Sequence, residues 1–256
     1  MPGGPAGEDK EGSVREDIKE TIFYGLLEKD FGARTKAQDL ARLIGIELMN
    51  EGDRAGELLP EEQSLCARYL VGRSILREAV KLLVGKGMLS VRRGIGTRIE
   101  PRQSWSAFDP EILGWQLSVA DPSFWRDLDE TRAIIEFSAI RLAAVRAEVD
   151  QKNLLSQAVH IMRENAETVE TVIAARALFH STLLKSTANK LLEGMTALVF
   201  ANLVFHFNLQ PHNGEKRQLI EHYAALYKAI DQNKPKLAED VMQRLLVSGR
   251  ANQERK

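Results

Sequence analysis

The sequence predicts a mainly α-helical protein, in which a small N-terminal unit of helices and one β-hairpin precedes an all-α helical bundle. Two observations predict this class. Residues 58–102 contain two short helical patterns with a turn between them, followed by two short strand patterns around glycines. From residue 122 onward, apolar residues recur at helical spacing without strand alternation. A chain of 256 residues, 44% of them hydrophobic, is long enough for two such domains.

Residues 1–34 are expected to form a flexible tail and then an extra helix. The first 13 residues include four glycines and two prolines, which disfavour regular structure. Val14, Ile18, Ile22 and Leu26 then recur every four residues, which is typical of a helix. Thr35 has the residue type of a helix N-cap, so a second helix is expected to begin there and to end between residues 50 and 56.

Residues 35–102 have the order of elements of a winged helix-turn-helix domain. Helices are predicted over residues 61–70 and 74–86, joined by the turn 71–73, and a β-hairpin over residues 88–100. In such a domain the second helix enters the major groove of DNA and the hairpin, or wing, lies along the DNA backbone. Residues 103–121 are predicted to be a linker in which Trp105 and Trp115 pack this domain against the helical half.

The net charge of −1 hides an uneven distribution. Residues 58–102 carry nine basic and four acidic side chains, a charge of +5, whereas residues 1–57 carry eight basic and thirteen acidic ones, a charge of −5. The remaining residues sum to −1. A solvated charged surface is one interpretation of the arginines. Because the charge coincides with the helix-turn-helix pattern, a DNA-binding surface is favoured.

The second helix and the wing supply the candidate DNA contacts. Arginines at the start of the helix can reach base edges, and arginines on the wing are expected to bind phosphates. The expected DNA-binding residues are Arg68, Arg73, Ser74, Arg77, Arg92, Arg93, Gly94 and Gly96. A dinucleotide-binding loop at these glycines is excluded, because the sixth position of that motif is Ile99 and a strand follows.

This N-terminal half resembles the DNA-binding domain of the GntR family of bacterial transcription regulators. The resemblance lies in Leu59-Pro60-Glu61-Glu62, Leu65, Val71-Gly72-Arg73-Ser74-Ile75-Leu76-Arg77-Glu78-Ala79, Leu82, Gly87 and Arg93-Gly94-Ile95-Gly96-Thr97. The sequence departs from the family at Gln63, where an arginine that contacts DNA is usual, and at Ile75, where proline is common. The resemblance implies a double-stranded operator as partner and leaves its sequence open.

Residues 122–252 are predicted to form the helical bundle. Asp121 and Pro122 begin a long helix that ends near residue 148. Further helices are expected over residues 151–168, 170–187, 189–209, 215–231 and 235–250. All five histidines of the chain lie in this half, which suggests a polar pocket, although lone histidines in bundles are more often surface or core residues. Arg132 and Glu136 lie one turn apart, as do Arg176 and His180, so each pair shares a helix face.

The helical half resembles the FCD domain, the ligand-sensing domain of the FadR subfamily. The resemblance lies in Glu130-Thr131-Arg132 with Glu136, Phe179-His180, Asn189, Glu221-His222 and Ala229-Ile230. Many such domains bind a metal through an aspartate and three histidines. Here His180 and His222 match as metal ligands, but Arg176 occupies the position of the aspartate and Leu245 that of the last histidine. The resemblance therefore implies an incomplete metal site, and no cofactor is expected.

Because Arg176 places a permanent cation beside His180, which would repel a divalent metal, we expect Arg176 and Arg132 to bind the carboxylate of the effector directly, with His180 and His222 as hydrogen-bonding partners. The expected effector-binding residues are Arg132, Glu136, Arg176, His180 and His222. The segment 105–115 resembles the linker of galactonate regulators, which implies a sugar acid or a similar small carboxylate as effector.

These features predict a homodimeric, ligand-responsive transcription regulator, a repressor that its effector releases from an operator. Two alternatives within the family stay open, a metal-dependent carboxylate sensor and an acyl-CoA sensor. An enzyme built on the helical bundle is disfavoured, because no nucleophile with its base and no full metal site can be assembled. A single cysteine and the absence of a signal peptide or membrane span predict a cytoplasmic location without a membrane partner.

Overall fold

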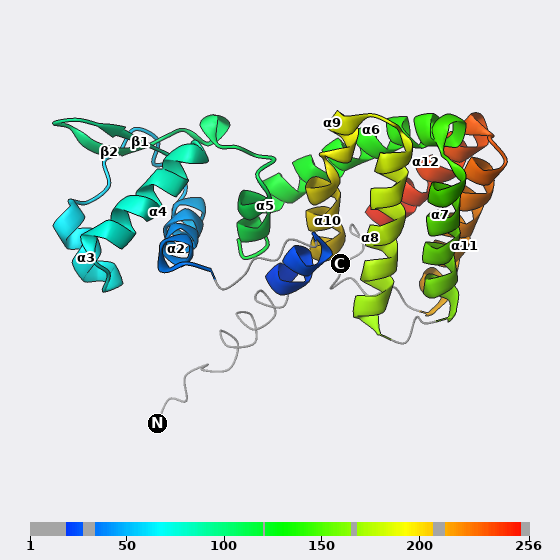
Figure 1. The fold of residues 1–256 in the computed structure, drawn as a ribbon, viewed down its shortest axis with the longest axis horizontal. Helices are drawn as coiled ribbons and strands as arrows, with labels where there is room; N and C mark the ends of the chain where they lie inside the picture. The colour runs from blue at the N-terminus through cyan, green and yellow to red at the C-terminus, as the bar shows by residue number, and fades with distance from the viewer. Residues whose placement is uncertain (1–18, 28–33, 120, 165–167, 207–212, 252–256) are drawn as a thin grey trace, which may run out of the picture. The chain divides into compact units, whose positions relative to one another are not determined.

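The computed structural model describes residues 19–27, 34–119, 121–164, 168–206 and 213–251. The chain divides into two compact units, Met1–Asp121 and Pro122–Lys256. The described residues form a mainly α-helical fold with one two-stranded antiparallel sheet, which lies in the first unit (Figure 1). The predicted fold class is therefore confirmed.

The first unit contains five helices of more than one turn, a short 3-10 helix and a β-hairpin within its described residues. Residues 19–26 form a helix that precedes the elements labelled in Figure 1. The others are α2 (Lys36–Asn50), α3 (Glu62–Tyr69), α4 (Arg73–Gly85), β1 (Leu89–Arg92), β2 (Gly96–Ile99), the 3-10 helix η1 (Arg102–Ser104) and α5 (Pro110–Gln116).

Helix α2 begins as the sequence predicts. The hydroxyl of Thr35 accepts a hydrogen bond from the backbone N–H of Gln38, and the Gln38 side chain accepts one from the backbone N–H of Thr35. This reciprocal pair satisfies two N–H groups that the first turn otherwise leaves unpaired. Leu40, Ile44 and Leu48 are buried on one face of α2, as expected.

The helix-turn-helix and the wing form around one core. Leu70 ends α3 in a left-handed conformation, and Leu76 and Leu83 of α4 are buried against the same core as α2. Strands β1 and β2 pair antiparallel in the register from Leu89 opposite Ile99 to Arg92 opposite Gly96.

The connector is more ordered than a linker. Asp109 caps α5 through its carboxylate and Pro110 occupies the first turn, a combination that starts a helix well. Trp105 and Trp115 are buried in the core of the first unit, and the ring of Trp115 fills the space beside Gly45. The structure thus assigns both tryptophans to the core of the first unit, whereas the sequence placed them between the two domains.

The extra N-terminal helix packs on the first unit. Phe23 and Tyr24 are buried. Both contact α5 at Gly114, where a Cβ would overlap with their side chains. Glu20 is buried too, and its carboxylate accepts hydrogen bonds from Arg34 and Arg42. Residues 14–18 of the predicted helix lie outside the described residues.

The second unit is a bundle of antiparallel helices. Its described elements are α6 (Pro122–Arg146), α7 (Val149–Glu164), α8 (Val169–Ser186), α9 (Lys190–Glu193), α10 (Thr196–Phe205), α11 (Asn213–Asp231) and α12 (Pro235–Ala251). The core packs α7 against α8 and α12 against α6 and α11. Within the described residues, none of the helices has the length and hydrophobicity needed to span a bilayer.

One predicted helix is interrupted. The sequence predicts a single helix over residues 189–209, but the structure has α9 and α10 on either side of Gly194 and Met195. Asn189 caps α9 by accepting hydrogen bonds from two backbone N–H groups, and Gly194 ends it. Glycine favours the helix interior less than any residue except proline, which explains the break. Residues 207–209 lie outside the described residues.

Candidate functional site

The start of α4 presents two arginines to solvent. The side chains of Arg73 and Arg77 are 72% and 66% exposed, and Ser74 between them is exposed as well. Gly72 caps this helix without a side-chain hydrogen bond, so no side chain blocks the backbone N–H groups of the first turn. An exposed helix N-terminus with arginines one turn apart suits phosphates and base edges.

Glu62 of α3 is a residue that the sequence reasoning missed. Its carboxylate accepts a hydrogen bond from Nε of Arg77 at 3.1 Å and lies 3.9 Å from Nε of Arg73. These are exposed ion pairs, which contribute little to stability. They hold both guanidinium groups beside the start of α4 in the absence of DNA. The spacing of 15 residues between Glu62 and Arg77 gives no local sequence signal for this contact.

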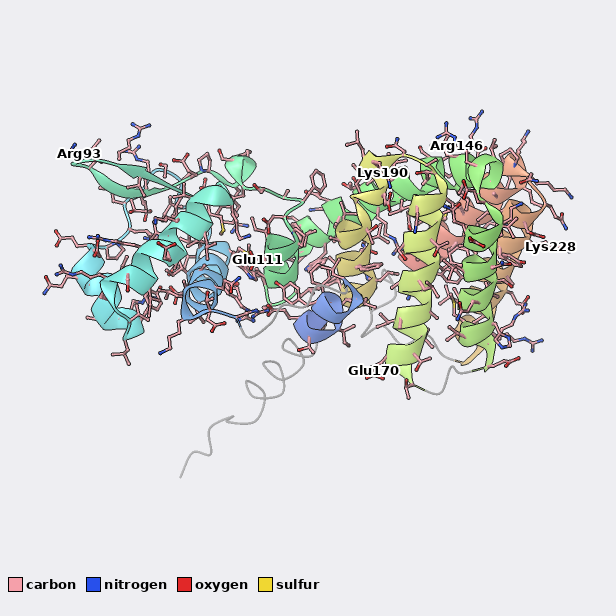
Figure 2. The ribbon with its side chains drawn as sticks, viewed as in Figure 1. Arg93, Glu111, Arg146, Glu170, Lys190 and Lys228 are labelled. Atoms are coloured by element: carbon pink, nitrogen blue, oxygen red, sulfur yellow. The ribbon has the colours of Figure 1, made fainter. Side chains whose placement is uncertain are left out.

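The wing carries the second group of candidate DNA contacts. Arg92, Arg93, Gly94 and Gly96 are all exposed, and Figure 2 shows Arg93 at the tip of the hairpin. Gly94 and Gly96 have φ of 78° and 119°, values that favour glycine and permit the tight turn. The structure therefore brings these residues together at the end of the hairpin, as predicted from their spacing.

Arg68 lies apart from this group. It lies in the last turn of α3, where Nη2 donates a hydrogen bond to Glu47 at 3.0 Å and the guanidinium lies over the ring of Tyr69. The same Glu47 carboxylate accepts from the hydroxyl of Tyr69 at 2.6 Å. Arg68 is thus tied to α2 within the first unit, unlike the arginines of α4 and the wing.

A buried polar network joins four helices of the second unit. Arg132 of α6 donates hydrogen bonds from Nε to Glu136 at 2.7 Å and from Nη1 to Asn202 of α10 at 2.6 Å. Its Nη2 lies 3.2 Å from Nε2 of His180 on α8, and the hydroxyl of Tyr223 on α11 lies 2.7 Å from the same nitrogen. Arg132 is 8% exposed and the other residues of the network named here are fully buried.

The contacts of His180 fix its protonation. A guanidinium can only donate hydrogen bonds, so Nε2 of His180 must accept one from Arg132 and cannot carry a proton. Nδ1 then carries the proton and faces the carboxylate of Glu136 in a close contact. Burial lowers the pKa of His180, and Arg132 and Arg176 lower it further against the opposing effect of Glu136. His180 is therefore neutral at pH 7.

The charge of Glu136 balances that of Arg132. Burial, the largest single effect, raises the pKa of Glu136, but the charge of Arg132 and the contacts with His180 and Arg132 together outweigh it and lower the pKa to about 2. Glu136 and Arg132 form a compensated pair inside the bundle. Such pairs tend to define a geometry rather than to add much stability.

Arg176 is the cation of this site that remains available. Its Nε donates a hydrogen bond to the hydroxyl of Tyr223 at 3.1 Å, and the residue is partly exposed. Its two terminal nitrogens make no hydrogen bond to any residue in the part of the chain that the structure describes. One guanidinium edge with two donors is thus left for an anion, next to a network that is otherwise satisfied.

The network continues on the far side of Arg132. Asn202 donates from Nδ2 to Asp129 at 2.6 Å, and Nε2 of His206 lies 2.7 Å from the same carboxylate oxygen. Asp129 and Asn202 were missed by the sequence reasoning. Asn202 and His206 are polar residues inside the most apolar stretch of the chain, and that position was the available signal.

Tyr223, rather than the adjacent His222, makes hydrogen bonds to the predicted effector-binding residues Arg176 and His180. The structure brings Arg132, Glu136, His180 and Arg176 together through the Tyr223 hydroxyl. His222 makes no hydrogen bond to them within the described residues, and burial, with Arg244 acting in the same direction, lowers its pKa. Consecutive residues of a helix point about 100° apart, so His222 and Tyr223 cannot share one face.

The donor set does not fit a divalent metal. Within the described residues, no three His, Cys, Asp or Glu side chains come together as metal ligands. The lone pair of His180 that could bind a metal already accepts hydrogen bonds from Arg132 and Tyr223, and Arg176 places a permanent cation beside it. His180 and His222, the two predicted metal ligands, share no hydrogen-bond partner among the described residues.

Comparison with known families assigns most of the chain. Residues 36–99 match the family model described as "Bacterial regulatory proteins, gntR family". Residues 127–248 match the FCD domain model. The first range contains the helix-turn-helix and the wing, and the second contains the buried network.

Individual relatives agree with these matches. The chain is 24% identical to the galactonate operon transcriptional repressor of Escherichia coli (strain K12) over 83% of this chain and 94% of that protein. It is 27% identical to the transcriptional repressor NanR of Klebsiella aerogenes over 91% of each. The structure of Lar, which controls the agr system of Listeria monocytogenes, shares the fold with a TM-score of 0.61 at 19% identity, over 88% of this chain and 99% of that one.

Proposed function

Because this chain belongs to the gntR family of bacterial regulatory proteins and is a DNA-binding regulator with an effector-binding FCD domain, we propose that it represses an operon for a sugar acid or related carboxylate. Binding of that carboxylate would release the repressor from DNA. Support comes from its similarity to the galactonate operon repressor over 83% of its length. Members of this family are transcription regulators and not enzymes. A cytoplasmic location follows from this role.

On DNA, the proposal divides the contacts between α4 and the wing. Arg73, Ser74 and Arg77 would contact base edges in the major groove, where a bidentate arginine–guanine contact discriminates by about 1 to 3 kcal/mol. Arg92 and Arg93 would bind phosphates, which adds affinity without sequence preference. DNA would displace Glu62 from Arg77, since a carboxylate repels the phosphates that approach the same guanidinium.

A homodimer is the assembly that this mechanism requires. Two copies related by a two-fold axis would place two α4 helices on the halves of a palindromic operator. An effector that favours one spacing of these helices over the other would shift the population, and a coupling free energy of about 1 to 3 kcal/mol is typical.

In the second unit, Arg176 is the proposed partner of the effector's carboxylate. The observation that carries this proposal is that the terminal nitrogens of Arg176 have no partner among the described residues, while all three nitrogens of Arg132 do. Tyr223 and His180 would position Arg176 and line the same site. Arg132 and Glu136 would then hold His180 in place, so their contribution to binding would be indirect.

No resident metal is part of the proposal. The effector would bind through arginine rather than through a metal, because the lone pair of His180 that faces this site is already engaged by Arg132 and Tyr223. A metal-dependent carboxylate sensor is therefore the less favoured alternative.

A thermal-shift series tests this function. The purified full chain would be heated with galactonate, other aldonates, hexuronates, lactate, dicarboxylates and an acyl-CoA, each with and without a divalent metal. A sugar acid that raises the melting temperature equally with and without metal is the expected result. Stabilisation that needs the metal, or near-stoichiometric zinc, nickel or manganese in the purified protein, would contradict it.

A further inference from the structure

Helix α6 is buried on one face and carries exposed apolar side chains on the opposite face. Its inner face carries the network residues Arg132 and Glu136 and is buried in the bundle. Its outer face carries Ile134, Phe137 and Val145, which are 70%, 40% and 65% exposed. At 100° per residue, these three lie within one narrow stripe. Large apolar side chains grouped in this way on a surface helix indicate a contact surface.

Two charged residues flank the apolar pair on the same stripe. Glu130 lies one turn before Ile134, and Arg141 lies one turn after Phe137. Glu130 is exposed and forms no hydrogen bond or ion pair within the described part of the chain. Arg141 is 70% exposed and reaches Glu239 only at 3.7 Å, a distance and exposure at which an ion pair contributes little.

The order of these four residues is complementary to itself. In an antiparallel pair of identical helices related by a two-fold axis, a residue of one helix faces a residue of the other when the sum of their two residue numbers has one fixed value. The residue numbers of Glu130 and Arg141 have the same sum as those of Ile134 and Phe137. One two-fold axis between residues 135 and 136 therefore places Glu130 opposite the partner's Arg141 and Ile134 opposite the partner's Phe137. A stripe that complements its own copy in this way is suited to an isologous contact.

We propose that this outer face of α6, defined by Glu130, Ile134, Phe137 and Arg141, packs antiparallel against the same face of a second copy of the chain. Glu130 would pair with the partner's Arg141, and Ile134 would pack on the partner's Phe137. The two-fold axis makes each contact twice. The inference rests on the proposed homodimer and specifies which surface forms it.

The size of the face is consistent with the central part of such an interface. The stripe from Glu130 to Arg141 spans about 16 Å at 1.5 Å per residue. A stable interface buries about 800 Å² on each partner, so the helix pair would form its centre. Val145, further along the same stripe, extends the apolar surface by one more turn.

The proposed contact also connects Arg132 and Glu136 to the dimer interface through a single helix. They lie on the inner face of the same helix whose outer face would meet the partner. A change in the polar network on effector binding would therefore act on the helix that joins the two subunits, without any intermediate element.

Sedimentation velocity of the full chain without DNA tests the interface. The wild-type chain is expected at twice its mass of 28.7 kDa. The variants Glu130→Arg and Arg141→Glu would each place like charges opposite one another twice, and at least about tenfold weaker dimerisation is expected. The double variant E130R/R141E restores opposite charges in the same register and should recover the wild-type dimer.

Apolar variants give an independent measurement. Ile134→Asp should weaken the dimer about 100-fold or more, because it places a carboxylate against the partner's Phe137. Leu191→Asp on α9 is the matched control, since Leu191 is 79% exposed and lies off the stripe. It should leave the dimer unchanged, and circular dichroism should show that every variant keeps its helical content.

The outcomes distinguish three failures: that of the homodimer, that of this interface and that of its antiparallel register. A wild-type chain that sediments as a monomer would overturn the proposed homodimer and this interface together. A wild-type dimer that Ile134→Asp and the single charge reversals leave intact would overturn the interface alone. Loss of the dimer in the single variants with no recovery in E130R/R141E would overturn the antiparallel register.

Discussion

Nη2 of Arg132 lies 3.2 Å from Nε2 of His180, inside the helical unit and 48 residues away along the chain. Because the guanidinium only donates, this contact keeps His180 neutral and turns its proton toward Glu136. The hydrogen bond from Arg132 occupies the lone pair on Nε2 of His180 that a metal would need. It leaves Arg176, on the other side of Tyr223, as the group with donors to offer an anion.

The neutral state of His180 predicts a pH-dependent stability. In the unfolded chain His180 has its ordinary pKa of 6.5, and the folded state lowers it, so the unfolded state binds more protons below that pH. The free energy of unfolding should therefore fall as the pH drops below 6.5. Glu136 adds to the loss between pH 4.5 and about 2, as its carboxylate becomes protonated.

Urea unfolding at pH values from 8 to 5 measures this effect. His180→Gln should be less stable at pH 8 and should lose less stability on acidification than the wild type. His222, whose pKa is also lowered, contributes in the same direction, so the slope should diminish rather than vanish. His160→Gln, at an exposed position of α7, is the control for replacing a histidine and should be about as stable as the wild type at pH 8. An equal slope in His180→Gln would contradict a neutral buried His180.

Arg77→Ala should weaken specific operator binding strongly while leaving the fold intact. Arg77 is exposed one turn into α4, and within the described residues it pairs with the exposed Glu62, so its removal costs little stability. Loss of a bidentate base contact weakens binding to the operator by about 10- to 100-fold and leaves non-specific DNA binding nearly unchanged. A gel-shift assay with operator and unrelated DNA measures both. Unchanged operator affinity would show that α4 is not the recognition helix.

Arg93→Ala should act differently from Arg77→Ala. Arg93 lies at the tip of the wing, where a phosphate contact is proposed (Figure 2). Its removal should weaken binding to all DNA sequences alike. It should also reduce the slope of log affinity against log salt concentration by about 1, since one fewer counterion is released. A loss confined to the operator, at an unchanged salt slope, would instead assign Arg93 to a base.

Gly87→Ala should destabilise the first unit. Gly87 has φ of 73°, and a Cβ there would stand 2.1 Å from the carbonyl oxygen of Ser104, which is backbone and cannot rotate away. Left-handed strain alone costs about 1 to 2 kcal/mol, and the overlap adds to it. Gly85→Ala is the matched control, because its added Cβ meets nothing within 4 Å and glycine is the poorer helix former. Thermal melting of both variants should move in opposite directions, and an unchanged melting temperature for Gly87→Ala would contradict this packing.

Patterns local in sequence predicted most of the fold. Thr35 and Gln38 stand three residues apart, and the wing follows from glycines at 94 and 96, so both could be predicted. Gly194 was present in the sequence too, but one glycine within an apolar stretch did not outweigh the helical period around it. The connector helix was missed, although Asp109 and Pro110 carried its start signal.

The functional sites divide in the same way. Arg132 and Glu136, one turn apart, could be paired from spacing alone, as could Arg176 with His180. Asn202 and Tyr223 could not, because their contacts join residues 43 to 73 positions apart. Which of His222 and Tyr223 faces the network depends on the rotation of α11, and this rotation is set by packing. Glu62 likewise reaches Arg77 only once α3 and α4 are folded against each other.

The central claim, that Arg176 binds the carboxylate that releases this regulator from DNA, is tested most directly by fluorescence anisotropy of a labelled operator. The DNA complexes of the wild type and Arg176→Gln would be titrated with the sugar acid that gives the largest thermal shift. Both should bind the operator equally. Arg176→Gln should need about 10 to 100 times more of the acid for release, as expected for loss of a charge-assisted contact. Release of both complexes at the same concentration would contradict the claim.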